Sequence, residues 1–180
     1  MSMEPYEGSL SSLADTPFGY TLSMIGGKWR LVIMYWLVEC ETMRFNELKR
    51  KIGRITDKTL SRQLKDLGFR ISIDDFGSGN NGETSLLDYH VDFVKIDMEI
   101  VRDIDVAKDH QDIARNLIVY AHDRGIRVIA EGVETEAELR ALRELGADYV
   151  QGYLTGRPAP EPRDVDDEVK RLIRSLNDAR

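Results

Sequence analysis

Hydrophobic and polar positions follow two different patterns along this chain, one before and one after Leu67. From Tyr20 to Val38 the apolar residues recur at helical spacing, and Gly26-Gly27 divides them into a short helix and a longer one. After Leu67, short apolar runs each end in a polar residue, as strands of a parallel sheet do. We expect such strands at 71–75, 91–97, 127–134 and 147–153. The pattern therefore predicts an α/β fold, with three or four N-terminal helices followed by a four-stranded parallel sheet.

Two short helices are predicted between Phe45 and Leu67, joined by a turn that contains Gly53. Asn46 or a neighbour would cap the first helix, and Thr56 would cap the second. The second helix has an inner stripe of leucines and an outer face of polar and basic side chains. We expect Leu60, Leu64 and Leu67 inside, and Lys58, Thr59, Ser61, Arg62, Gln63 and Lys65 outside.

These two helices have the ingredients of a helix-turn-helix, in which the second helix reads DNA. Arg62 and Gln63 carry the paired donors that recognise guanine and adenine edges. An ordinary helical hairpin with a solvated charged face fits the periodicity equally well, and both interpretations stay open at this point.

Three longer helices are expected among and after the strands. One runs from His110 to Arg124, one from Glu136 to Leu145 and one from about Asp164 to Leu176. Their predicted inner residues are Ile113, Leu117 and Tyr120; Leu139, Leu142 and Leu145; and Val165, Val169, Leu172 and Leu176.

Charge is distributed unevenly along the 180 residues, whose net charge is −7. The stretch 44–65 holds eight Lys and Arg against two Asp and Glu, which suggests a basic contact surface on an acidic body. No apolar run approaches the roughly 20 residues that span a bilayer, and we identify no secretory leader. The single cysteine, Cys40, cannot form an internal disulfide. These features favour a cytoplasmic protein without a membrane anchor.

The N-terminal motifs resemble those of HxlR-type winged-helix regulators, relatives of the MarR group. The matching pieces are Gly26-Gly27-Lys28-Trp29-Arg30, Arg44-Phe45-Asn46-Glu47-Leu48, Ile55-Thr56 and Leu60-Ser61-Arg62-Gln63-Leu64-Lys65. The resemblance covers about 17–67 and implies DNA binding through residues 44–65, with contacts from Arg44 and from the outer face of the second helix. The β-hairpin wing and the dimerisation helix of that family do not follow Leu67.

Residues 67–160 resemble instead the C-terminal half of an EAL domain, the cyclic di-GMP phosphodiesterase family with a (β/α)8-type barrel. The matching motifs are Asp74-Asp75-Phe76-Gly77, Val91-Asp92 with Lys95-Ile96-Asp97, Ala130-Glu131-Gly132-Val133-Glu134-Thr135, and Gln151-Gly152-Tyr153 with Gly156-Arg157-Pro158. The chain thus divides into a tail (1–16), an incomplete winged-helix segment (17–67), a half-barrel of EAL type (68–160) and a C-terminal helix (161–180).

Acidic and polar side chains stand at the carboxyl ends of the expected strands, where ligands gather in parallel βα folds. Adjacent carboxylates at such an end suit a hard divalent cation. The EAL resemblance implies Asp74 and Asp75 as metal ligands, Glu131, Lys95 and Glu134 as catalytic residues, and Gln151 and Asp97 as substrate-binding residues. A cap or a surface position would explain Asp97, Glu134 or Gln151 equally well.

The departures from the family point to a relic site. The Glu-Ala-Leu element is absent, as are the ligands of the missing half-barrel, and residues 80–84 read Asn-Asn-Gly-Glu-Thr where the family has an aromatic residue and serines. We therefore expect Mg²⁺ or Mn²⁺ and cyclic di-GMP to bind weakly at most, and no hydrolysis. The alternatives are a working phosphodiesterase or cyclic di-GMP binder, and a scaffold without evolved function.

Both parent folds are cut in mid-fold near residues 64–68, which suggests a recombinant chain and favours laboratory construction over natural fusion. A half-barrel would leave two open sheet edges and an uncovered apolar face. We therefore expect a homodimer formed mostly by the C-terminal halves, with the N-terminal helices as the alternative cover for the sheet.

Overall fold

A computed structural model describes residues 16–40, 43–77, 91–161 and 163–178 of the chain. The expected tail, apart from Thr16, and the 80–84 loop lie outside the described residues. The chain forms two compact units, Met1–Phe69 and Arg70–Arg180, and each is described separately below. Among the described residues, no helix is both long enough and apolar enough to cross a bilayer.

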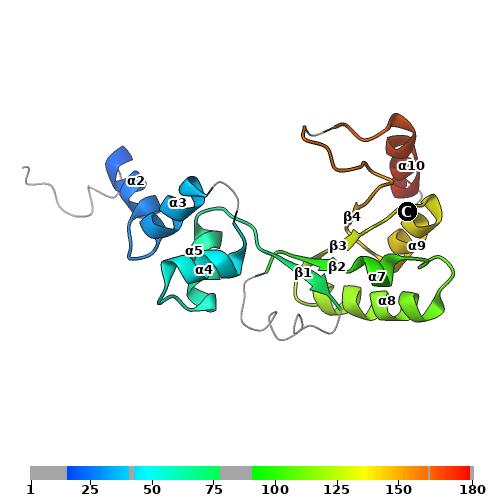
Figure 1. Cartoon of the computed structure of the whole chain (residues 1–180), viewed down its shortest axis with the longest axis horizontal. Helices are drawn as coiled ribbons and strands as arrows, with labels where there is room; N and C mark the ends of the chain where they lie inside the picture. The colour runs from blue at the N-terminus through cyan, green and yellow to red at the C-terminus, as the bar shows by residue number, and fades with distance from the viewer. Residues whose placement is uncertain (1–15, 41–42, 78–90, 162, 179–180) are drawn as a thin grey trace, which may run out of the picture. The chain divides into compact units, whose positions relative to one another are not determined.

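The first unit contains four described helices (Figure 1). They are α2 (Pro17–Ile25), α3 (Arg30–Glu39), α4 (Phe45–Ile52) and α5 (Asp57–Asp66). Gly53 ends α4, and Thr56 caps α5 by accepting a hydrogen bond from the Thr59 amide, as expected. The side-chain cap expected from Asn46 or a neighbour is wrong, because Arg44 occupies the N-cap of α4 and makes no side-chain bond there.

The core of this unit is small and lies where α3, α4 and α5 meet. Its buried hydrophobic residues are Ile33, Leu48, Ile55, Leu60 and Leu64. Trp29 and Trp36 are only half-buried, and Leu22 and Val32 are exposed, although all four belong to the apolar run from Tyr20 to Val38. Much of the apolar surface of α2 and α3 thus remains uncovered within this unit.

One residue of α5 faces the opposite way from the prediction. Ser61 is fully buried, and its hydroxyl donates to the Lys58 carbonyl, so its placement on the outer face is wrong. A serine one position after Leu60 still falls on the inner side of the helix, because the buried stripe is wide enough to include it.

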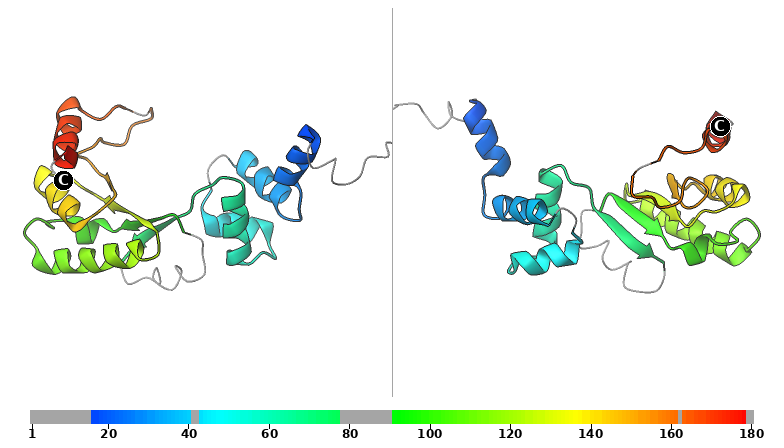
Figure 2. Two further views of the ribbon diagram at one scale, coloured as in Figure 1. Left: turned by 180° about the vertical axis from the view of Figure 1, so that it is seen from behind. Right: turned by 45° about the horizontal axis from the view of Figure 1, so that its top comes forward.

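The second unit is built on a four-stranded parallel sheet, in the order β1-β2-β3-β4, which confirms the prediction (Figures 1 and 2). The strands are β1 (Ser72–Phe76), β2 (Phe93–Ile96), β3 (Arg127–Glu131) and β4 (Tyr149–Gln151). Consecutive strands lie side by side, as expected for neighbouring units of a (β/α) barrel.

Helices pack on one face of the sheet and make the core with it. They are α7 (Met98–Val101), α8 (Lys108–His122) and α9 (Glu136–Leu145). Strand residues Val94, Ile96, Val128 and Ala130 are fully buried against these helices. Gly146, in the left-handed conformation, ends α9 where the sequence predicted.

Two helical predictions need correction. The buried face of α8 is formed by Ala114, Leu117, Ile118 and Ala121, whereas Ile113 is exposed, because the inner stripe is displaced by one position. The last helix, α10 (Asp167–Asp178), begins three residues later than expected, and none of its residues is fully buried. Its Leu172 and Leu176 nevertheless pack against the core.

An aspartate ties each of two strand pairs together where the strands begin. Asp92 accepts the Ile71 amide through its carboxylate at 3.0 Å and donates its own amide to the Ile71 carbonyl at 2.9 Å. Asp148 repeats this with Val128, at 2.8 and 3.1 Å, and its carboxylate also bonds His122 Nε2. The same reciprocal pair therefore occurs in β1–β2 and in β3–β4.

The sheet face away from these helices is mixed in character, so the expected uncovered apolar face is wrong. Phe93 and Tyr149 pack edge to face on it, with centroids 5.9 Å apart. Arg127 donates to the Tyr149 hydroxyl, and Arg70 lies over the Phe93 ring. Arg70 and Arg127 thus place positive charge beside these two rings at the amino ends of the strands.

Candidate functional site

The end of β1 places two adjacent carboxylates on one side of the sheet. In a regular strand Asp74 and Asp75 would point to opposite faces. The pairing of β1 with β2 shifts between Ile73 and Phe76, so three steps on β1 match two on β2. Asp75 absorbs the extra residue by adopting φ +54°, in the left-handed region that few non-glycine residues occupy. This bulge turns the Asp75 carboxylate toward the same region as that of Asp74.

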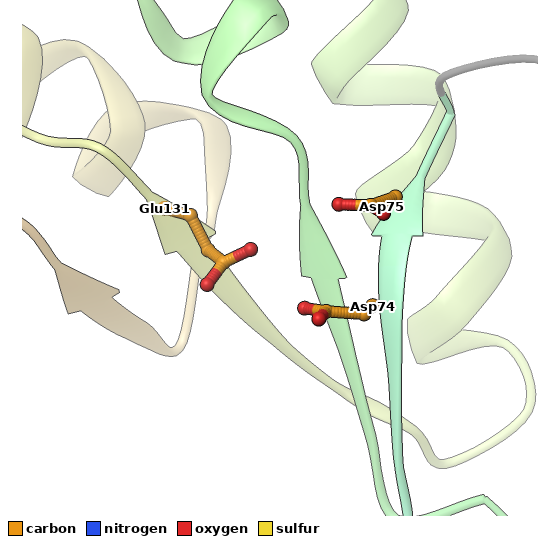
Figure 3. Close-up of side chains that lie close together, drawn as sticks. All are labelled: Asp74, Asp75 and Glu131. Carbon is orange, nitrogen blue, oxygen red and sulfur yellow. The ribbon is translucent and has the colours of Figure 1, made fainter. Parts of the chain in front are cut away.

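Glu131, at the end of β3, completes a cluster with these two aspartates (Figure 3). One carboxylate oxygen from each residue lies within 4.8 Å of the others. Asp74 and Asp75 are exposed, and Glu131 is half-buried. All three stand at the carboxyl edge of the sheet, where the sequence predicted a ligand site.

Lys95, on β2 between them, is held by two of these carboxylates. Its Nζ lies 3.1 Å from Asp74 Oδ1 and also donates to Glu131 Oε1. Partial burial acts to lower the pKa of the Lys95 ammonium, but hydrogen bonds and charge attraction from Glu131 and Asp74 outweigh it and raise that pKa. The ammonium therefore stays charged at neutral pH and neutralises part of the cluster.

Three carboxylates at this spacing fit one hard divalent cation such as Mg²⁺ or Mn²⁺, which prefers oxygen ligands. Asp74, Asp75 and Glu131 would hold it, and the ion would supply charge stabilisation and an acidified water. The Lys95 ammonium competes for two of these three residues. A pair of ions would need more carboxylates than this cluster of described residues provides.

The other predicted site residues lie nearby with simpler roles in the structure. Asp97 caps α7 by accepting the Glu99 amide at 2.7 Å, which is the structural explanation considered for it. Glu134 is exposed in the loop after β3. Gln151 ends β4, where its carbonyl accepts the Val133 amide, and its side chain is exposed. The structure brings none of these three into the carboxylate cluster.

Sequence reasoning missed Glu138, a buried carboxylate that holds the loop between β3 and α9. It accepts the amides of Glu134 at 2.9 Å, Thr135 at 3.0 Å and Asp103 at 3.2 Å. Burial acts to raise the pKa of Glu138, but these backbone hydrogen bonds outweigh it and lower that pKa. The Thr135-x-x-Glu138 spacing is a capping box, so a motif search could have found the residue.

The predicted DNA-contacting side chains lie on α5, except Arg44, which is the N-cap of α4. Lys58, Arg62 and Lys65 are exposed on α5, and Arg44 is exposed at the start of α4. Thr59 and Gln63 are half-buried, and they bond to Thr56 and Asp66 respectively. The exposed basic residues thus form one face of α5, without Ser61.

A family model described as the EAL domain matches residues 45–158, and the chain belongs to this family. A crystal structure of a standalone EAL protein from Vibrio cholerae, in its cyclic di-GMP-bound form, has 35% identity and a TM-score of 0.59. The match covers 65% of this chain and 52% of that one. This likeness confirms the predicted EAL resemblance and the half-barrel of TIM type.

The N-terminal part is similar to a different class of protein. An uncharacterized HTH-type transcriptional regulator of Halalkalibacterium halodurans is 63% identical over 67 residues, which are 37% of this chain and 59% of that protein. This confirms the predicted resemblance to a transcriptional regulator.

The cyclic di-GMP phosphodiesterase NbdA of Pseudomonas aeruginosa is 40% identical over 101 residues, which are 56% of this chain and 13% of that enzyme. The chain thus spans only part of each of these relatives.

Proposed function

We propose that this protein binds DNA through α5 and carries an EAL-type half-barrel that does not hydrolyse cyclic di-GMP. The observation that carries the proposal is the exposed basic face of α5, with Lys58, Arg62 and Lys65 on a helix that follows a tight turn at Gly53. This geometry suits insertion into the major groove. The similarity of the N-terminal part to a regulator of the HTH type supports the same function.

The contacts that this face offers are mostly electrostatic. Lysine and arginine contacts to phosphates give binding that falls steeply with salt and selects sequences weakly. Arg62 carries the paired guanidinium donors that can also recognise a guanine edge. We therefore expect micromolar binding to duplex DNA at low salt, with a modest preference among sequences.

Fluorescence anisotropy with a random labelled duplex at low salt tests the DNA-binding half of this proposal. The double variant Lys58→Ala/Arg62→Ala should lose most of the affinity. The matched control Lys108→Ala/Arg115→Ala removes two basic residues from α8 and should bind as the unaltered protein does. No binding at about 10 μM protein, or equal losses in both double variants, would rule out α5 as the contact helix.

The absence of hydrolysis is inferred from the carboxylate cluster. Displacement at phosphorus assisted by two metals needs both ions held about 4 Å apart. Among the described residues, Asp74, Asp75 and Glu131 offer three carboxylates, and Lys95 already bonds two of them. Incubation of cyclic di-GMP with the protein and Mg²⁺ or Mn²⁺ should give no linear product by chromatography. Turnover that disappears in Asp74→Asn would contradict this part of the proposal.

A second candidate function is weak binding of one divalent cation, or of cyclic di-GMP, without turnover. The spacing of the three carboxylates favours the cation, and the similarity to EAL proteins favours cyclic di-GMP. Titration with Mn²⁺, followed by the loss of its free electron paramagnetic resonance signal, tests it directly. Binding should be weak and should disappear in Asp74→Asn. A scaffold without either activity is the remaining alternative. It follows if both the DNA titration and the Mn²⁺ titration are negative.

The proposal includes a recombinant origin and a homodimer. The similarity to a regulator over the N-terminal part and the EAL match over residues 45–158 support joining of two parent genes. A homodimer would bring two α5 helices to one DNA duplex, as dimeric helix-turn-helix proteins do.

A further inference from the structure

Helix α3 is apolar on two opposite sides. Only one of them packs against the core of the first unit, so the other side needs an explanation. Ile33 and Trp36 face the core of the first unit. Leu31, Met34, Tyr35 and Val38 follow the spacing i, i+3, i+4 and i+7, so they line the other side as one stripe. We refer to these four residues as the α3 stripe.

The α3 stripe is exposed along its whole length. Leu31 is 57% exposed, Met34 36%, Tyr35 57% and Val38 79%. Val32 on the same helix is also exposed, at 38%. Scattered apolar residues are normal on a protein surface, but a contiguous apolar row of this size marks an interaction site.

The chemistry of the patch restricts what can cover it. Between Leu31 and Val38 there is no charged residue, and α2 has none between Pro17 and Ile25. A nucleic acid or an anionic lipid surface would need basic residues there. A charged protein partner would likewise find no complementary group. Tyrosine and methionine at the centre of an uncharged patch are typical of protein interfaces.

A second copy of this chain satisfies these conditions, because a two-fold axis places the same uncharged stripe against itself. The exposed part of the stripe and of Val32 amounts to roughly 500 Å² per copy, so a pair would bury about 1,000 Å², the lower limit for a specific interface. The sheet face of the second unit is a poorer candidate, since Arg127, Lys95 and Glu131 lie on it.

We infer that the chain forms a two-fold homodimer in which α3 packs against α3 of a second copy. This deepens the homodimer of the proposed function and replaces the C-terminal interface expected from the sequence. Tyr35 lies near the middle of the stripe and packs edge to face on Trp36 of its own chain, with centroids 5.2 Å apart. The axis therefore passes close to Tyr35, and its ring is held in place before the partner arrives.

Sedimentation equilibrium of the full chain, at about 5–100 μM and moderate salt, tests the inference. The unaltered protein should sediment at twice its 20.6 kDa chain mass. Tyr35→Glu/Val38→Glu should be monomeric, with at least a tenfold weaker association and an unchanged far-ultraviolet circular dichroism spectrum. The matched control Val119→Glu alters a side chain that is 53% exposed on α8, and it should remain dimeric.

Disulfide trapping gives a second measurement that does not depend on destabilising charges. In a Cys40→Ser background, Tyr35→Cys should oxidise to a covalent dimer much faster than Val119→Cys does. A monomeric unaltered protein would overturn the homodimer itself. A dimer that persists in the double glutamate variant, or equal trapping at both cysteines, would overturn the α3 interface alone. If a monomeric protein still binds DNA, the DNA-binding proposal for α5 stands although the dimer proposal fails.

Discussion

Replacing Glu138 by alanine should destabilise the second unit strongly, although the residue touches no ligand. Its side chain is 6% exposed and accepts three backbone amides, those of Asp103, Glu134 and Thr135. Asp103 also has φ +56°, so its amide points at the carboxylate from a backbone conformation that needs support. Alanine would leave all three donors without their acceptor.

The size of the effect follows from the number of bonds and their burial. Hydrogen bonds to a charged group contribute about 1.5–3 kcal/mol when buried, and less where water replaces the lost partner. These three are partly buried, so about 1 kcal/mol each gives a loss near 3 kcal/mol. The capping box adds nothing to that sum, because its one bond to the Glu138 side chain, from the Thr135 amide, is already among the three.

Urea unfolding followed by circular dichroism at 222 nm measures this loss. The matched control is Glu136→Ala on the same helix. Its side chain is 54% exposed and pairs with Arg140 one turn away, so the expected loss is below about 0.5 kcal/mol. A loss below about 1 kcal/mol in Glu138→Ala, or equal losses in the two variants, would refute the reasoning.

The pH dependence gives an independent check. The pKa of Glu138 lies below its ordinary value of 4.5, so the folded protein binds this proton less readily than the unfolded chain. Stability from the carboxylate is therefore fully present above pH 4.5 and is lost as the pH falls through the folded pKa. The difference between the unaltered protein and Glu138→Ala should be constant from pH 6 to 8 and should narrow below pH 4.5. A difference that is the same at pH 3 and at pH 7 would mean that the charge plays no part.

Three further changes test the site and the sheet. Lys95→Met should raise the affinity for Mn²⁺ roughly tenfold in an electron paramagnetic resonance titration, because it removes the ammonium that competes for Asp74 and Glu131. An unchanged affinity would contradict that competition. Asp75→Asn should leave the free energy of unfolding within about 0.5 kcal/mol, whereas Asp75→Val should lower it by about 2 kcal/mol, since only asparagine tolerates the left-handed conformation; equal urea midpoints would refute this. Gly152→Ala should cost about 3 kcal/mol, because the added Cβ would lie 2.2 Å from the Val133 carbonyl oxygen; a stability unchanged in urea would refute it.

The sequence predicted the sheet well because its signals are local. Each strand is a short β-branched run that ends in a polar residue, and Gly146 ends α9 as expected. The inner face of α8 was harder to predict, because Ile113 and Ile118 are equally apolar and only the packing against the sheet decides which of them is buried. Ser61 was misplaced for the opposite reason, since a small hydroxyl that bonds its own helix can be buried at little cost.

The candidate site was predicted in its residue types and only partly in its geometry. Adjacent aspartates at a strand end indicated a cation site, and the structure brings them together with Glu131. The bulge and the positive φ of Asp75 cannot be read from the spacing, because they depend on how β1 pairs with β2. The bonds from Lys95 to Asp74 and Glu131 depend in the same way on the register of three strands.

Two aspartates, Asp92 and Asp148, make this sheet modular, because each bonds one residue of a neighbouring strand near the strand starts. Asp92 and Asp148 each hold the neighbouring strand through two hydrogen bonds formed with a single residue of that strand, so each fixes its alignment without help from any other strand. A strand pair with such a clamp keeps its alignment when the remainder of a barrel is removed or exchanged. Two-strand units of this kind can therefore be cut out, duplicated or joined to an unrelated helical segment without losing the alignment of their strands.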